Sequence, residues 1–199
     1  MLVSHIILAV LWIVYCVLHS LFASLAFKKW METLTDKHFR LYRLYYTLFA
    51  FISLTGIILY QFSISQKIIF KSNSFTLAIG SLVSITGLII MAICIRKYFM
   101  QFSGLRSLIE NNAGNKLMVT GIHKHVRHPL YSGTFLFIWG FLLLLPYWSL
   151  LITCSIITLY TLIGIRLEEN KLIREFGKPY EDYQNEVPMI IPRFTAKIG

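Results

Sequence analysis

The chain has 199 residues, of which 56% are hydrophobic and only 14% charged, and its mean hydropathy is +0.65. Soluble domains carry about 25% charged residues, and several windows here approach or exceed the ~18 apolar residues that a membrane-spanning helix needs. The composition excludes an ordinary soluble domain and indicates an integral membrane protein in contact with the lipid bilayer. We interpret the net charge of +10 as topology and contact with anionic lipid, and predict no nucleic-acid partner.

The first predicted span covers residues 5–27. A cleavable signal peptide is the rival interpretation, but the first lysine is Lys28, so no positive region precedes the apolar run. The run is also longer than a typical signal-peptide core, so we predict a retained helix. His19 within it is a candidate substrate or haem ligand, although such a histidine is more often hydrogen-bonded inside a bundle.

Four further spans are predicted, and all five are expected to be helices because lipid leaves only helices and closed barrels and no strand-like alternation is present. Pro146 interrupts the apolar pattern between the last two, which predicts a tight helical hairpin. The expected fold is therefore an all-α membrane protein with about five transmembrane helices, a cytoplasmic loop and a C-terminal tail. The four further spans are 44–63, 76–95, 130–146 and 148–165.

Small residues recur within or beside these spans, where they usually allow close helix packing. The three cysteines fall in apolar segments without paired spacing, so we interpret them as packing residues and predict no metal site. The glycines are Gly56, Gly80, Gly87, Gly140 and Gly164, and the cysteines are Cys16, Cys94 and Cys154.

Basic residues are unevenly distributed between the two sides of the predicted bundle. Of the 19 lysines and arginines, 17 follow the first, third or fifth span, and only Lys67 and Lys71 follow the second. The positive-inside rule makes the crowded side cytoplasmic and puts the N-terminus outside and the C-terminus inside. All nine acidic residues are on this side, so we expect the chemistry at the cytoplasmic face.

The stretch "HVRHPLYSG" (125–133) leads directly into the fourth span. One interpretation is a juxtamembrane basic segment, with Pro129 in the first helical turn and Arg127 reaching lipid phosphates. The other is a binding site, because a helix N-terminus favours an anion. Arg127 and His128 lie beside that terminus, and Tyr131 supplies an aromatic face.

A second polar group begins where the fifth span stops being apolar, in "IRLEENKLIREFGKPYEDYQNEVPMIIPRF". A solvated helix end explains it simply, with Arg166 paired at the surface with Glu169 or Asn170. Alternatively, the carboxylates at the end of the fifth span could lie close to the polar residues of 125–133, because the hairpin between them is short. There they could bind an amine or ribose hydroxyls of a ligand. The segment "VPMIIPRF" contains two prolines, so we expect an irregular segment that folds back towards the membrane surface.

Residues 115–194 approximately resemble the isoprenylcysteine carboxyl methyltransferase family of membrane methyltransferases. The resemblance lies in two motifs in the same order, separated by a hydrophobic hairpin: first "RHPLYSG" and then "EENKLIREFGKPYEDYQNEVP". The N-terminal half, with "LHSLFASLAFKKW" and "FRLYRLYYTLFAFISL", looks like bacterial relatives that include methanethiol S-methyltransferase. The resemblance implies a single membrane domain, 1–199. It would comprise a three-helix part, 1–95, and a part that binds S-adenosylmethionine, 96–199.

The resemblance also implies which residues form the site. Arg127, His128 and Glu168 would be the catalytic group, and Arg166 lies near the place expected to contact substrate. The family's arginine one turn before the glutamate is Gly164 here, and the position of His123 is commonly tyrosine. The implied cofactor-contacting residues are Asn115, Lys116, Leu117, Met118, His123, His128, Pro129, Leu130, Tyr131 and Glu168.

The implied reaction is methyl transfer from S-adenosylmethionine to a membrane-soluble or amphipathic nucleophile. Three acceptors remain open, namely a small thiol, an isoprenylcysteine carboxylate and a lipid amine. A thiol or amine must lose a proton, and a histidine could accept it. The alternative function is a non-enzymatic haem-binding or transport subunit that uses His5 and His19, although a transporter is expected to keep polar groups near mid-membrane.

Overall fold

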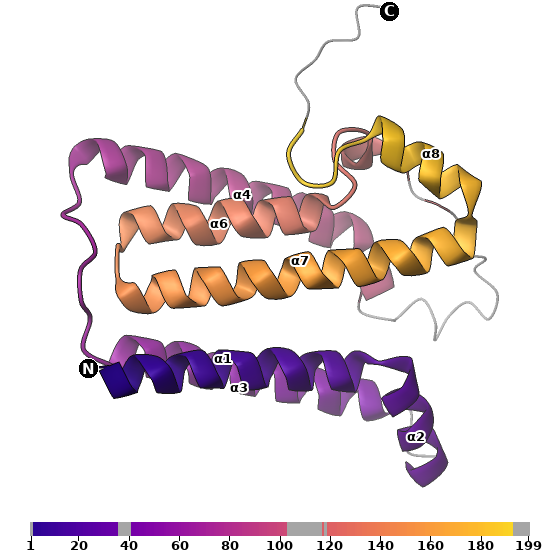
Figure 1. The fold of residues 1–199 in the computed structure, drawn as a ribbon, viewed down its shortest axis with the longest axis horizontal. Helices are drawn as coiled ribbons and strands as arrows, with labels where there is room; N and C mark the ends of the chain where they lie inside the picture. The colour runs from indigo at the N-terminus through magenta and orange to yellow at the C-terminus, as the bar shows by residue number, and fades with distance from the viewer. Residues whose placement is uncertain (1, 36–40, 103–116, 118, 193–199) are drawn as a thin grey trace, which may run out of the picture. The chain divides into compact units, whose positions relative to one another are not determined.

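The computed structural model describes residues 2–35, 41–102, 117 and 119–192, and within these ranges the chain is helical with no paired strands. A single isolated bridge joins Ile68 and Tyr147. The predicted all-α fold is therefore confirmed (Figure 1). The helices are α1 Leu2–Ala23, α2 Leu25–Thr35, α3 Tyr42–Ser63, α4 Ser74–Phe102, the short 3₁₀ helix η2 Gly121–Lys124, α6 Pro129–Leu144, α7 Trp148–Phe176 and α8 Lys178–Glu186.

Four of these helices are long and apolar enough to cross a membrane, namely α1, residues Leu44–Ser63 of α3, residues Ser74–Arg96 of α4, and α7. The fourth predicted span is the 16-residue helix α6, which is apolar but shorter. Large hydrophobic side chains remain exposed along α1, α3 and α4, as expected where lipid is the solvent. The chain is a multi-pass integral membrane protein.

Several helix ends differ from the predicted spans, and α4 runs on to Phe102 where the predicted span ends at residue 95. Two further differences have a visible cause. The first helix ends at Ala23 rather than continuing to residue 27, because the chain bends at Ser24 before α2 begins. The last long helix does not stop with its apolar segment at residue 165 but continues to Phe176. A helix can leave the apolar region without ending, since its backbone hydrogen bonds stay satisfied in water as in lipid.

The chain divides into two compact units, one formed by residues 1–71 and 146–160 and the other by residues 72–145 and 161–199. In the first unit, Leu8, Trp12 and Ile57 form the buried core of α1 and α3. Polar contacts also connect its helices. The hydroxyl of Thr153 donates to Oε1 of the buried Gln61 at 2.6 Å.

In the second unit, α4 and α6 lie side by side along their length (Figure 1). A Cβ atom on Gly87 would lie 2.5 Å from the backbone nitrogen of Phe137 and 2.6 Å from the carbonyl oxygen of Gly133. A Cβ on Gly140 would lie 2.6 Å from the hydroxyl of Ser84. Only glycine permits so close an approach of two helices.

The predicted packing glycines therefore separate into two groups. Gly80, Gly87 and Gly140 do lie in the close α4–α6 contact, and Gly133 adds a fourth position that the prediction missed. Among the described residues, nothing lies within 4 Å of a Cβ added at Gly56 or Gly164. Within this part of the chain, the prediction of close helix packing is wrong at those two positions.

Candidate active site

The segment before α6, which belongs to the second unit, turns sharply and carries Arg127 and His128. Gly121 begins η2 with φ of 67°, in the region that glycine reaches without steric cost. Pro129 then occupies the first turn of α6, where its missing N–H costs no helical hydrogen bond. The turn and the proline together fix Arg127 and His128 immediately before the helix.

The other half of the site comes from the last turns of α7 and from α8. Glu168 and Glu169 lie on α7 beyond its apolar part, and α7 ends at Phe176. Gly177 follows with φ of 61° and starts α8. This turn brings α8 and the segment after it back towards the start of α6.

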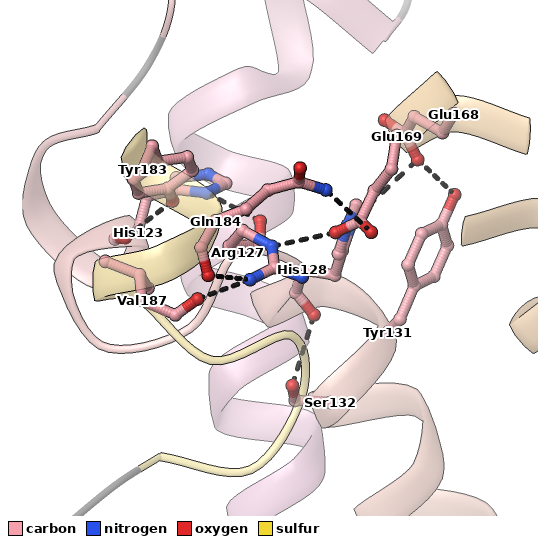
Figure 2. A network of polar contacts seen from close by, with 10 residues as sticks. All are labelled: His123, Arg127, His128, Tyr131, Ser132, Glu168, Glu169, Tyr183, Gln184 and Val187. Carbon is pink, nitrogen blue, oxygen red and sulfur yellow. Dashed lines mark hydrogen bonds and ion pairs between the residues drawn. The ribbon is translucent and has the colours of Figure 1, made fainter. Parts of the chain in front are cut away.

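Glu169 is the centre of a polar network (Figure 2). Its Oε1 accepts a hydrogen bond from Nε of Arg127 at 2.7 Å and one from Nε2 of His128 at 3.1 Å. Its Oε2 accepts from the side-chain amide of Gln184 at 3.1 Å. The side chains of Arg127 and Glu169 are only 11% and 12% exposed, so this is a charge pair largely withdrawn from solvent and stabilised by additional hydrogen bonds.

The contact with Glu169 also determines the tautomer of a neutral His128 ring. A carboxylate can only accept, so Nε2 carries a proton and, in the neutral ring, Nδ1 is the acceptor. Nδ1 lies 3.8 Å from Oε2 of Glu168, and the ring stacks on Tyr131 with centroids 5.7 Å apart. The buried ring thus offers a proton-accepting atom on the side of Glu168.

Glu168 differs from its neighbour in exposure and in partners. Its side chain is 46% exposed, and the hydroxyl of Tyr131 donates to its Oε2 at 3.3 Å. Figure 2 shows Glu168 and Tyr131 beside the Glu169 network, at the edge of the group. Of the two carboxylates, Glu168 is therefore the one that a ligand can reach.

The end of α8 and the chain after it are attached to the start of α6 mainly through backbone carbonyl groups. Nη1 of Arg127 donates to the carbonyls of Gln184 at 2.9 Å and Val187 at 2.5 Å. Three further bonds extend the attachment. Arg127 N donates to Pro188 O at 2.9 Å, His128 N to Met189 O at 3.0 Å and Ser132 Oγ to Ile190 O at 2.7 Å. The irregular segment expected at "VPMIIP" is confirmed for residues 187–192, and it lies against the site.

The structure brings most of the predicted catalytic and cofactor residues close together. Arg127, His128, Tyr131 and Glu168 belong to one cluster, and Nδ1 of His123 lies 3.0 Å from the carbonyl oxygen of Arg127. Leu117 packs against Tyr180, Tyr183 and Val187. Pro129 and Leu130 form the first turn of α6, and Arg166 is exposed on α7. Asn115, Lys116 and Met118 lie outside the described residues.

The sequence analysis missed the residue on which the network depends. The carboxylates at the end of the fifth span are predicted either to be solvated or to meet the first polar group, but only Glu168 is assigned to the site, whereas the structure pairs Glu169 with Arg127. Gln184, Ser132 and the carbonyl groups after α8 were also not predicted. The two consecutive glutamates at 168 and 169 could have indicated this second role. Neighbouring side chains on a helix point about 100° apart, so each glutamate can contact a different partner.

The alternative of a haem site on α1 has little geometric support. His5 and His19 are separated by about 21 Å along the helix at 1.5 Å per residue, so one iron cannot take both. His19 stacks on Tyr15 with centroids 5.6 Å apart and lies 3.0 Å from the hydroxyl of Tyr46. Among the described residues, no group of three or more His, Cys, Asp or Glu side chains is placed to hold a metal ion.

Comparison with known proteins supports a methyltransferase relationship. The family model described as "Protein of unknown function (DUF1295)" matches residues 2–187. Methanethiol S-methyltransferase of Crocosphaera subtropica is 30% identical over 201 residues, which cover 92% of this chain and 73% of the relative. Methanethiol S-methyltransferase 1 of Bradyrhizobium diazoefficiens is 30% identical over 186 residues, covering 89% and 63% of the two chains.

A more distant relative matches only part of the chain. Protein-S-isoprenylcysteine O-methyltransferase of Schizosaccharomyces pombe is 34% identical over 84 residues, which cover 42% of this chain and 36% of the relative. No solved structure matches the chain.

Proposed function

Since the chain belongs to the DUF1295 family and is homologous to membrane methyltransferases, we propose that it transfers a methyl group from S-adenosylmethionine to a small thiol. The observation that carries the proposal is the cluster at the start of α6. There, a half-exposed carboxylate, an aromatic ring and a buried histidine of fixed tautomer come together.

The residues of this cluster fit the chemistry of the proposed methyl donor. S-adenosylmethionine supplies an activated methyl group on a positively charged sulfur. It also carries an amine and ribose hydroxyls, which are donors that a carboxylate can accept. Glu168 is the accessible carboxylate, and Tyr131 and His128 present stacked rings beside it. We therefore assign Glu168, Tyr131, His128 and Leu117 to the donor site, together with Asn115, Lys116 and Met118.

The charge distribution favours a thiol over a carboxylate as the acceptor. Two nitrogens of the Arg127 guanidinium already contact Glu169 and two backbone carbonyls, so this cation is largely engaged by the protein itself. Gly164 offers no cation one turn before Glu168, and Arg166 is exposed. Among the described residues of this cluster, a prenylcysteine carboxylate would lack a cation that is ready to bind it. The names of the similar bacterial proteins, methanethiol S-methyltransferases, also support a thiol.

In the proposed reaction the thiol sulfur forms a bond to the methyl carbon, and the carbon–sulfonium bond breaks with its electron pair passing to the sulfonium sulfur. The thiol proton must leave, and we assign Nδ1 of His128 as its acceptor, because Nδ1 carries the free electron pair of the neutral ring when Nε2 donates to Glu169. The network otherwise positions the reacting atoms, and the segment 187–190 covers the start of α6. Positioning and exclusion of water are the main protein contributions to such a displacement.

The test is a methyl-transfer assay with the purified protein in lipid nanodiscs and labelled S-adenosylmethionine. Methanethiol, a farnesylcysteine analogue and phosphatidylethanolamine are offered separately. We expect turnover with the thiol, and Glu168→Gln should reduce it whereas Glu175→Gln on the exposed face of α7 should not. Turnover of the farnesylcysteine analogue alone would refute the thiol assignment, and a Soret band with no donor binding would favour the haem alternative.

We also propose that the site faces the cytoplasm, with the N-terminus outside. The proposal is supported by the 17 of 19 basic residues that follow the first, third and fifth predicted spans, as the positive-inside rule requires. Reporter fusions check it. A C-terminal reporter should be cytoplasmic and an N-terminal reporter external, and two reporters on the same side would contradict this topology.

A further inference from the structure

Tyr180 on α8 carries a buried hydroxyl that has no hydrogen-bond partner among the described residues. The side chain is 1% exposed, and it is the largest fully buried side chain of the described chain. Buried hydroxyls are almost always paired, because an unpaired one loses its bonds to water without replacement. The unpaired hydroxyl of Tyr180 therefore needs an explanation.

Tyr183, one turn further along the same helix, shows the usual arrangement. Its hydroxyl donates to the carbonyl oxygen of His123 at 2.7 Å. Both tyrosines belong to one apolar cluster with Val187, and both are buried. Burial alone does not explain why one hydroxyl is satisfied and the other is not.

The surroundings of Tyr180 keep its hydroxyl protonated. Burial raises the pKa of Tyr180, and the negative charges of Glu169 and Glu168 raise this pKa further, against a smaller opposing effect of Arg127. At physiological pH the group is therefore a hydrogen-bond donor. The helix that carries Tyr180 also contacts the polar network directly, because the side-chain amide of Gln184 donates to Oε2 of Glu169 at 3.1 Å.

A residue of the proposed donor site packs against the cluster that contains Tyr180. This residue is Leu117, which we assign to the donor site and which lies against Tyr180, Tyr183 and Val187. A ligand that displaces Leu117 would uncover the cluster beside Glu169. Such a ligand would be enclosed by protein, as a water-sensitive transfer requires.

We propose that Tyr180 is a ligand-positioning residue whose hydroxyl donates a hydrogen bond to an acceptor atom of the bound methyl donor. The inference rests on the proposed function, since it takes the donor to be bound at this network. It assigns to α8 a direct role in binding, whereas the contacts of Tyr183 and Gln184 make α8 a structural support.

The test compares Tyr180→Phe with Tyr183→Phe in nanodiscs, using thermal unfolding without ligand and calorimetric titration with S-adenosylhomocysteine. Tyr180→Phe should leave the unfolding temperature unchanged or raise it, because it removes an unpaired polar atom. It should also weaken binding by roughly three- to tenfold, the range expected for one hydrogen bond. Tyr183→Phe should lower the unfolding temperature, because it loses the contact with His123.

Three results would overturn the inference. Wild-type affinity in Tyr180→Phe, together with normal binding by the wild-type protein, would show that the hydroxyl does not contact the donor while leaving the proposed function intact. Failure of the wild-type protein to bind S-adenosylhomocysteine would overturn both proposals. A fall in unfolding temperature equal to that of Tyr183→Phe, without any loss of affinity, would assign Tyr180 a structural role instead.

Discussion

The body and the first turn of α6 are held in place by opposite means. Along its body, Gly133 and Gly140 let the helix approach α4 so closely that an added Cβ would lie 2.9 Å from the carbonyl oxygen of Gly87 or 2.6 Å from Oγ of Ser84. At its first turn, a charge pair and five hydrogen bonds to backbone carbonyls attach the chain to α7, to Gln184 of α8 and to the segment after α8. Close backbone contact fixes where the helix lies. The directional polar contacts fix which groups the first turn presents.

The difference has a physical reason. In lipid the hydrophobic effect does not favour helix association, so close packing of small residues must supply the attraction. Near the membrane surface, water competes for polar groups, and a charge pair holds its geometry only when it is shielded and its remaining donors are satisfied. We therefore expect substitutions in the body of α6 to affect folding, and substitutions at its first turn to affect the site as well.

The largest effect is expected for Gly87→Leu in the α4–α6 contact. A side chain there must displace the backbone of α6, and overpacking of this kind costs about 1–3 kcal/mol or more. Folded protein recovered by size-exclusion chromatography should fall sharply. The matched control is Gly56→Leu, where an added Cβ meets nothing within 4 Å, and an equal loss in both variants would contradict the close-packing interpretation.

The next largest effect is expected for Glu169→Gln, which leaves Arg127 without its charged partner. A fully buried pair broken in this way costs about 3–5 kcal/mol, but Arg127 keeps its bonds to two backbone carbonyls, so we expect a loss of about 1–2 kcal/mol, and both stability and donor binding should fall. Thermal unfolding measures the first effect. The double variant Arg127→Met with Glu169→Met should be more stable than Glu169→Gln, because no unpaired charge remains, and the reverse order would show that the pair is weakly buried.

Glu168→Gln should separate binding from stability. This carboxylate is 46% exposed, so its neutralisation should leave the unfolding temperature nearly unchanged. Binding of S-adenosylhomocysteine should weaken roughly tenfold, as expected for one hydrogen bond to a charged group. His128→Ala should weaken binding too, and wild-type affinity in both variants would remove these residues from the donor site.

A smaller effect is expected for Ser132→Ala, which removes one bond between α6 and the segment after α8. The hydroxyl of Ser132 is buried and donates to the carbonyl of Ile190 at 2.7 Å. Its loss should cost about 1 kcal/mol and increase proteolysis after residue 187 without affecting the α4–α6 contact. Unchanged proteolysis would show that the remaining bonds are sufficient.

The smallest effect is expected for Asp182→Asn on the outer face of α8. Asp182 and Lys178 form a 2.7 Å ion pair, but both side chains are mostly exposed, and solvent and salt weaken such pairs. Neither unfolding temperature nor donor affinity should change measurably. A clear loss in either measurement would indicate that this face of α8 contributes to the site.

The sequence by itself determined the class of fold and the elements that carry the site. Apolar segments of spanning length can only be helices in lipid, which fixed the all-α membrane fold. The positions of Arg127, His128 and Glu168 at the ends of such segments identified the candidate cluster. These features depend on composition and local spacing, which are visible along the chain.

Only the tertiary structure decided how the cluster is connected. Arg127 pairs with Glu169 and not with Glu168, because neighbouring residues on α7 point in directions about 100° apart and the orientation of the helix selects one of them. The attachment of residues 187–190 depends on backbone carbonyls, which every residue possesses and no sequence pattern marks. The orphan hydroxyl of Tyr180 likewise differs from the paired one of Tyr183 only in where folding has placed each of them.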